Sequence, residues 1–198
     1  MADQHLSSDS DRKAARRRIA AKRRSLSETE RRHAEQRVAH CLRHLPAMRR
    51  ARHVSVYLAV NGELALDAFI ARASSRAIQL YAPVLNGDEL RFGLLEDNTP
   101  LKLNGFGIPE PLGGPYIDPR SLDIVLTPLV GFDERGVRLG MGGGYYDRSF
   151  RFLGSRSNWR KPKLVGIGFE FQYFEKIKPR DWDIGLSNAV TETELRSF

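Results

Sequence analysis

The chain has 198 residues, of which 41% are hydrophobic and 28% charged, and its mass is 22.4 kDa. This length and composition exclude general disorder and two large domains, so we expect a flexible polar tail over residues 1–10 and one domain over residues 11–198. The single cysteine, Cys41, excludes an internal disulfide and a cysteine-rich zinc site, and it indicates a reducing compartment. No apolar run approaches the roughly 20 residues that span a bilayer, and the polar start lacks a leader pattern, so the sequence predicts a cytoplasmic protein without a membrane span.

The net charge of +8 is concentrated in one part of the chain. Residues 11–52 contain 15 Lys and Arg against 4 Asp and Glu, which leaves a net charge of −3 on the remaining residues. Charge alone leaves three explanations open: a solvated helix face, an RNA-binding arm, or charges that attract a phosphate-bearing ligand.

The first predicted elements are two helices. Residues 11–24 are rich in Ala and Arg and contain no helix breaker, which predicts a first helix. Ser27 and Glu30 form a capping box, and apolar residues then recur at helical spacing up to Pro46. This pattern predicts a second helix.

Strands that alternate with helices follow along the chain. Short β-branched and apolar runs predict buried strands, and breaks in these runs predict turns. We expect strands over 53–60, 78–84, 90–95, 122–129 and 164–169, helices over 64–73 and 145–153, and a long surface connection over 104–119. This alternation predicts a layered α/β sheet, in which ligands usually bind beyond the carboxyl ends of the strands.

The segment PLVGFDERGVRLGMGGGYYDR, residues 128–148, carries the strongest functional signal. Clustered glycines let backbone N–H groups approach an anion, and Arg138 and Arg148 flank these glycines with positive charge. Asp147 is a hard oxygen ligand of the kind that Mg²⁺ takes beside phosphate. The segment matches neither the P-loop nor the dinucleotide fingerprint, so it predicts another kind of phosphate cradle, the alternative being a glycine-rich turn that only permits close packing.

This segment resembles the signature of the 5-formyltetrahydrofolate cyclo-ligases, also called 5,10-methenyltetrahydrofolate synthetases. Further features of that family occur in the same order: a basic first helix, the stretch YLAVNGE over residues 57–63, and Trp182-Asp183-Ile184 followed by Ala189-Val190-Thr191. The resemblance implies a three-layer α/β/α, Rossmann-like sheet of the NagB/RpiA/CoA transferase-like type, with a basic N-terminal helical segment.

The resemblance also implies the chemistry. In that family ATP phosphorylates the formyl oxygen of 5-formyltetrahydrofolate, the nitrogen at position 10 attacks, and phosphate leaves, so the expected partners are ATP, Mg²⁺ and this folate. The residues implied for ATP are Lys13, Arg17, Arg138, Leu139, Gly140, Met141, Gly142, Gly143, Gly144, Tyr145 and Tyr146. Those implied for the folate are Leu58, Glu63, Met141 and Tyr145, and those implied for magnesium are Asp147 and Asp183.

Some assignments stay open at this point. Arg16 stands where the family pattern usually has an apolar residue, so the first-helix arginine that contacts phosphate is undecided, as is the role of Met141. An ATP-dependent kinase or ligase acting on another pterin or small anion is the main alternative function. A noncatalytic RNA-binding protein is a second alternative, but no RNP-like aromatic motif supports it. We expect a monomer that binds neither nucleic acid nor a membrane.

Overall fold

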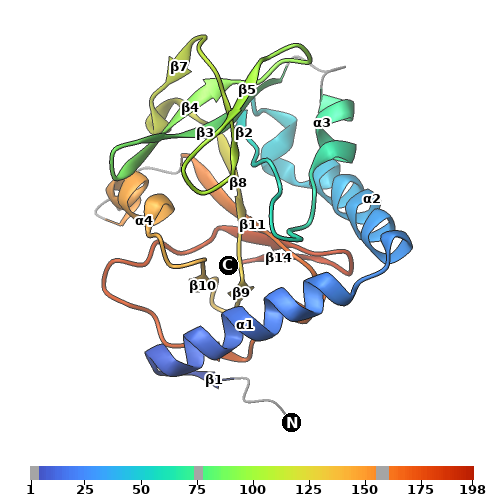
Figure 1. Ribbon diagram of the computed structural model, residues 1–198, viewed down its shortest axis with the longest axis vertical. Helices are drawn as coiled ribbons and strands as arrows, with labels where there is room; N and C mark the ends of the chain where they lie inside the picture. The colour runs from blue at the N-terminus through green and yellow to red at the C-terminus, as the bar shows by residue number, and fades with distance from the viewer. Residues whose placement is uncertain (1–4, 74–77, 155–160) are drawn as a thin grey trace.

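A mixed sheet forms the centre of the molecule (Figure 1). The computed structural model describes residues 5–73, 78–154 and 161–198. Eight strands of this described part pair in the order β14-β13-β11-β8-β2-β3-β4-β7. Their bounds are β2 His53–Ser55, β3 Gln79–Asn86, β4 Glu89–Leu94, β7 Tyr116–Ile117, β8 Ile124–Pro128, β11 Lys163–Ile167, β13 Asn188–Val190 and β14 Leu195–Ser197. The five strands from β13 to β3 pair in parallel, and antiparallel strands lie at both edges.

Apolar side chains cover both faces of the sheet. Along β8, Ile124 and Leu126 belong to the core that contains α2 and α3, whereas Val125 belongs to the core beside α4. This alternation is expected of a strand buried on both faces. The helices are α1 Asp9–Ser25, α2 Glu28–His44, α3 Asp67–Ala73 and α4 Tyr145–Ser149, with single turns at η1 Pro46–Arg49, η2 Pro119–Ser121, η3 Arg151–Leu153 and η4 Glu170–Gln172. The predicted α/β class with a layered sheet is confirmed.

Helix α1 lies across the end of the sheet, next to β9 Gly131–Phe132 and β10 Arg138–Leu139 (Figure 1). Its buried side chains are Arg12, Ala15, Ile19 and Arg23, which recur at helical spacing. The apolar members pack on a separate small core that includes Leu139 and Phe174. Two arginines therefore belong to the buried stripe of this helix rather than to its solvent face.

The helix starts match local capping chemistry. Ser27 and Glu30 form the predicted capping box of α2, and Ser8 and Asp11 form a second one at α1. This second box begins α1 at Asp9, two residues earlier than expected. In the described part of the chain, no helix is both long and apolar enough to cross a membrane.

The N-terminal expectation needs correction. Residues 5–6 form β1, His5–Leu6, which pairs in parallel with β12, Lys176–Ile177, and α1 follows directly. The predicted flexible tail over 1–10 is therefore wrong for residues 5–10, and residues 1–4 lie outside the described part. The physical reason is that Leu6 is buried in the core below α1, which fixes the segment.

Several predicted elements differ in length. The strand expected over 53–60 ends at Ser55, and the following residues form an irregular loop held by a hydrogen bond from the Tyr57 hydroxyl to the Leu64 carbonyl. The helix expected over 145–153 ends at Ser149 and continues as η3. The connection over 104–119 contains β7 and β6, Pro109–Pro111, which pairs with β5, Leu101–Leu103.

Candidate functional site

The glycine-rich segment lies between the end of the central strand β8 and the helix α4. After the β9–β10 hairpin, residues 140–144 form an exposed loop that leads into Tyr145, the first residue of α4. Gly142 has φ +106° and Gly144, the N-cap of α4, has φ +68°. Residues other than glycine rarely adopt such positive φ values. Glycine at both positions therefore permits this loop conformation and leaves the backbone N–H groups uncovered by side chains.

One arginine of α1 contacts this loop. The Arg16 Nε–H donates to the Gly140 carbonyl over 2.9 Å, and a Cβ atom placed on Gly142 would lie 3.6 Å from the Arg16 Cζ. Lys13 and Arg17, which the family resemblance assigned to ATP, are exposed on α1, and their role stays a prediction. The geometry adds Arg16 as a further cation of α1 that contacts the glycine loop.

The charges around Arg16 are mostly positive. Burial is the largest cause of a lowered pKa for Arg16, and the neighbouring Arg12 and Arg180 lower that pKa further, whereas Asp9 raises it. A partly buried cation beside two others is destabilised until an anion joins it. This corner of the molecule is therefore suited to bind a polyanion such as a phosphate chain.

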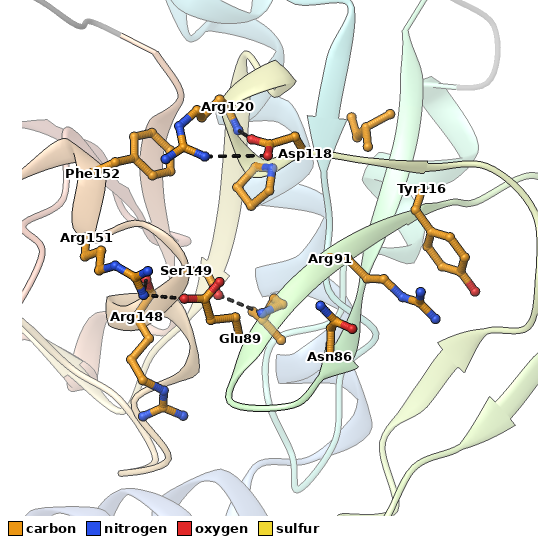
Figure 2. A pocket seen from close by; sticks show the side chains of 13 residues that line it. Asn86, Glu89, Arg91, Tyr116, Asp118, Arg120, Arg148, Ser149, Arg151 and Phe152 are labelled. Atoms are coloured by element: carbon orange, nitrogen blue, oxygen red, sulfur yellow. Dashed lines mark hydrogen bonds and ion pairs between the residues drawn. The ribbon is translucent and has the colours of Figure 1, made fainter.

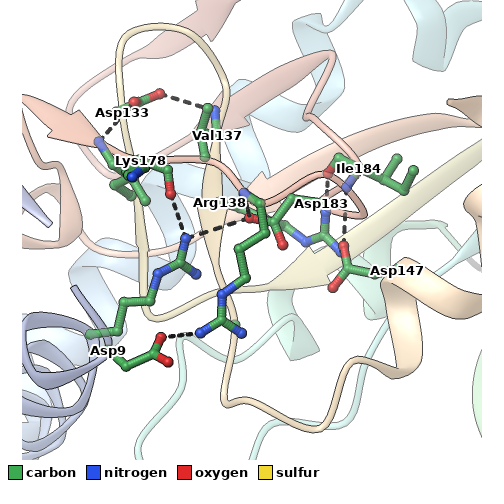
Figure 3. A network of polar contacts seen from close by, with 12 residues as sticks. Asp9, Asp133, Val137, Arg138, Asp147, Lys178, Asp183 and Ile184 are labelled. Atoms are coloured by element: carbon green, nitrogen blue, oxygen red, sulfur yellow. Dashed lines mark hydrogen bonds and ion pairs between the residues drawn. The ribbon is translucent and has the colours of Figure 1, made fainter. Parts of the chain in front are cut away.

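The two candidate metal ligands lie in one polar network (Figure 3). The Asp147 Oδ1 accepts hydrogen bonds from the Arg138 Nη2, at 2.7 Å, and from the Ile184 N–H, at 3.1 Å. The Asp183 Oδ2 accepts from the Arg180 N–H at 2.9 Å and lies 3.6 Å from the Arg12 Nη2. The described residues contain no group of three or more His, Cys, Asp or Glu that could hold a metal alone.

Asp133 holds the hairpin that carries the glycine loop, and the sequence did not single it out. This carboxylate is fully buried and accepts from the N–H groups of Arg135, Val137 and Ile177, each at 3.0 Å. It thereby joins the turn between β9 and β10 to β12. The only sequence signal was its place directly after Gly131-Phe132, which also fits an ordinary turn.

Two of the predicted folate residues, Leu58 and Glu63, lie in the irregular loop between β2 and α3. The Glu63 Oε2 accepts from the Val60 N–H at 3.2 Å. Burial raises the pKa of Glu63, and the Val60 hydrogen bond and nearby Arg23 partly offset this. Burial also raises the pKa of Tyr146, and Glu63 raises it further, because the two groups are close. The structure thus brings Glu63 next to α4, beside half-buried Leu58 of the same loop.

An aromatic pair lies beside the glycines. The ring of Phe106, at the end of the β5–β6 hairpin, meets the ring of Tyr145 edge-on with centroids 5.9 Å apart. Phe106 is 63% exposed, so its ring is accessible for packing against a planar ligand. Asn104 shapes this tip, since its Oδ1 accepts from the N–H groups of Phe106 and Ile108. No local sequence pattern marks Phe106, because it lies within the segment that is expected to be a surface connection.

A separate groove of about 800 Å³ lies between α4, η3 and the strands β4 and β7 (Figure 2). Arginine side chains line it together with Glu89 and Asp118, and two of the arginines stack on rings: Arg91 on Tyr116 and Arg120 on Phe152. None of the residues that the resemblance assigned to ATP, folate or metal lines this groove.

Comparisons with known proteins agree with the geometry. The pattern of the 5-formyltetrahydrofolate cyclo-ligase family matches residues 8–192. The chain is 35% identical over 164 residues to the 5-formyltetrahydrofolate cyclo-ligase of Haemophilus influenzae, covering 79% of this chain and 84% of that protein. It is 34% identical over 184 residues to the Escherichia coli K12 protein of the same name, covering 89% and 98%. The solution structure of Aquifex aeolicus 5,10-methenyltetrahydrofolate synthetase superposes with a TM-score of 0.80 at 32% identity, covering 94% and 92%.

Proposed function

Because the chain belongs to the 5-formyltetrahydrofolate cyclo-ligase family, we propose that it catalyses the ATP-dependent cyclisation of 5-formyltetrahydrofolate to 5,10-methenyltetrahydrofolate. ADP and phosphate are the other products. The observation that carries the proposal is the exposed glycine loop, which lies between Arg16 of α1 and the Arg138–Asp147 pair. Phosphoryl transfer requires such an arrangement of backbone donors and cations more than it requires a tuned acid and base.

On the nucleotide side, the backbone of residues 140–144 would bind the phosphates of ATP. We assign a first-helix cation to Arg16, because it donates to the Gly140 carbonyl, with Arg12 one turn earlier, where it donates to the Lys178 carbonyl and lies 3.6 Å from Asp183. Lys13 and Arg17 are then outer residues that attract the nucleotide without holding it. Reaction begins when the γ-phosphate is held against the formyl oxygen.

The residues present fit a magnesium ion. Asp147 and Asp183 supply two hard carboxylates, and Mg²⁺ is usually bound by one or two carboxylates together with phosphate oxygens. When bound, the ion would neutralise charge on the phosphates and help to align them. Arg138 and Arg12, which pair with these carboxylates, keep both side chains in place.

On the folate side, Glu63 would accept hydrogen bonds from N–H groups of the pterin, with Leu58 against its ring. Tyr145 and Phe106 would enclose the aromatic part of the substrate. Once the γ-phosphoryl group is on the formyl oxygen and ADP has been released, the nitrogen at position 10 forms a bond to the formyl carbon and loses its proton to solvent. The C–O bond then breaks, the oxygen departs with phosphate, and ring closure is complete.

The test is the formation of methenyl product, which is monitored through the near-ultraviolet absorbance of that product. We expect product only when ATP, Mg²⁺ and 5-formyltetrahydrofolate are all present. ADP release without methenyl product would instead indicate a kinase or ligase acting on another pterin or anion. RNA binding that weakens steeply with salt, without nucleotide turnover, would support the RNA-binding alternative. That alternative is disfavoured because α1 buries two of its arginines, Arg12 and Arg23.

A further inference from the structure

A tight turn over residues 60–63 carries Glu63 in the loop between β2 and α3. Asn61 and Gly62 both have positive φ angles, +52° and +72°, as in a type I′ turn, which suits an Asn-Gly pair. Glu63 closes the turn, because its N–H donates to the Val60 carbonyl at 3.0 Å and its Oε2 accepts from the Val60 N–H at 3.2 Å. The position of the Glu63 carboxylate therefore follows the position of this turn.

Arg31 of α2 joins this turn to the end of α1. Its Nη1 donates to the Gly62 carbonyl at 3.3 Å, and its Nη2 donates to the Arg23 carbonyl in the last turn of α1. The last carbonyls of a helix lack partners within the helix and carry partial negative charge, so a guanidinium is well suited to bind them. Because its donors are fixed in a planar fork, the one side chain can bond to both backbone segments at once.

The turn also packs closely on these two helices. A Cβ atom placed on Gly62 would lie 3.3 Å from both the Arg23 Cβ and the Arg31 Nη2, so a larger residue would require a shift. Among the described residues, the bond from Arg31 is the only hydrogen bond that ties residues 60–63 to another element. Loss of this bond would leave the turn, and the carboxylate of Glu63 with it, without a hydrogen bond to either helix.

We propose that Arg31 is a positioning residue for the folate site, which holds the Glu63 turn in place through the Gly62 carbonyl. Arg31 touches no substrate in this account and acts through the backbone of the turn. The proposal rests on the folate-binding role of Glu63 stated under the proposed function. Since α1 also supplies Arg16 to the glycine loop, the same contact sets the place of Glu63 relative to the nucleotide side of the site.

The test compares the KM for 5-formyltetrahydrofolate with the KM for ATP in the parent and in Arg31→Met. Methionine occupies part of the same space but donates no hydrogen bond, so the turn should lose its fixed position. We expect the folate KM to rise about tenfold or more, the low end of the effect of losing a hydrogen bond from a charged group. The KM for ATP should stay within roughly twofold of the parent.

Arg32→Met is the matched control, because it removes the same charge from the next position of α2. That side chain is exposed and pairs with Glu28 of its own helix rather than with the turn. Both Michaelis constants of Arg32→Met should match those of the parent. A folate KM that rises equally in Arg31→Met and Arg32→Met would overturn the proposal, since it would show a general effect of charge.

A double-mutant cycle with Glu63→Gln separates positioning from a general loss of structure. If Arg31 acts through Glu63, Arg31→Met should raise the folate KM less than about threefold in the Glu63→Gln background, because the two effects are then not additive. A rise in that background as large as in the parent overturns the proposal. An unchanged folate KM in a folded Arg31→Met also overturns it.

Gly62→Ala reaches the same contact from the side of the turn, so the test does not depend on the folding of Arg31→Met. The added Cβ atom would press on the Arg31 Nη2, so the folate KM should rise without the KM for ATP, and parental constants would overturn the proposal. An unchanged folate KM in Glu63→Gln alone, with methenyl product still formed, would reject the folate role of Glu63 and with it this proposal. A parent enzyme that forms no methenyl product would instead reject the proposed function.

Discussion

Arg16 and Arg17 carry the same charge one residue apart, but their surroundings differ. The helix turns Arg16 toward Gly140, whereas Arg17 is exposed. The family resemblance assigns Lys13 and Arg17 to ATP, which stays a prediction, and the thin apolar stripe of α1 does not reveal from the sequence which side of the helix is buried. The buried set of Arg12, Ala15, Ile19 and Arg23 settles the orientation, and it includes charged residues that usually mark a solvent face.

For Arg16→Met we expect weaker ATP binding or slower phosphoryl transfer. Loss of hydrogen bonds to a charged partner costs about 1.5–3 kcal/mol, which corresponds to roughly a 10- to 150-fold fall in kcat/KM for ATP. Steady-state kinetics at varied ATP measures this effect.

Arg24→Met is the matched control, because it removes the same charge from an exposed position on α1. Equal losses in Arg16→Met, Arg17→Met and Arg24→Met would show a diffuse electrostatic effect and would refute a local contact.

Asp183→Asn tests the carboxylate side of the site. The amide keeps the shape of the side chain but removes the charge that Mg²⁺ prefers, so a higher Mg²⁺ concentration should be needed for half-maximal activity. Titration of activity with Mg²⁺ at fixed ATP measures the change. An unaltered magnesium dependence with parental turnover would remove Asp183 from the candidate ligands.

At the scale of the elements, the β9–β10 hairpin is the support of the glycine loop. Asp133 is the group that holds this hairpin, since it accepts three backbone hydrogen bonds and pairs with Arg135 at 2.9 Å. Asp133→Ala would leave buried N–H donors without a partner, and each such donor costs about 1–3 kcal/mol. We expect a clearly lowered Tm and a fall in activity.

Thermal unfolding followed by circular dichroism measures this change, and Glu134→Ala, at an exposed position in the same turn, is its control. A variant Asp133→Ala with the parental Tm would show that the hairpin does not depend on this carboxylate.

Elements that depend on local sequence patterns could be predicted, whereas those that depend on distant pairing could not. Helix α2 could be predicted because its capping box and apolar repeat are both local. The pairing of His5–Leu6 with Lys176–Ile177 could not, because those segments are far apart along the chain and neither is a strong strand former. The strands β13 and β14 are only three residues each, too short for alternation to be read.

At the scale of the whole molecule, the proposed site draws on four distant parts of the chain. Helix α1 supplies Arg16, the loop after β2 supplies Glu63, the glycine segment supplies the cradle, and the C-terminal region supplies Asp183. The parallel strands bring these segments to one end of the sheet, as expected for ligand sites of α/β proteins. The sequence motifs could indicate the parts, but their mutual distances depend on the whole fold.

The central claim is that this site drives ring closure by transferring phosphate to the formyl oxygen. It is tested most directly with 5-formyltetrahydrofolate labelled with ¹⁸O in the formyl group, incubated with the enzyme, ATP and Mg²⁺. The phosphate released is then analysed by mass spectrometry. We predict one ¹⁸O atom in each phosphate formed with methenyl product. Methenyl product accompanied by unlabelled phosphate, with the ¹⁸O recovered in water, would contradict the account.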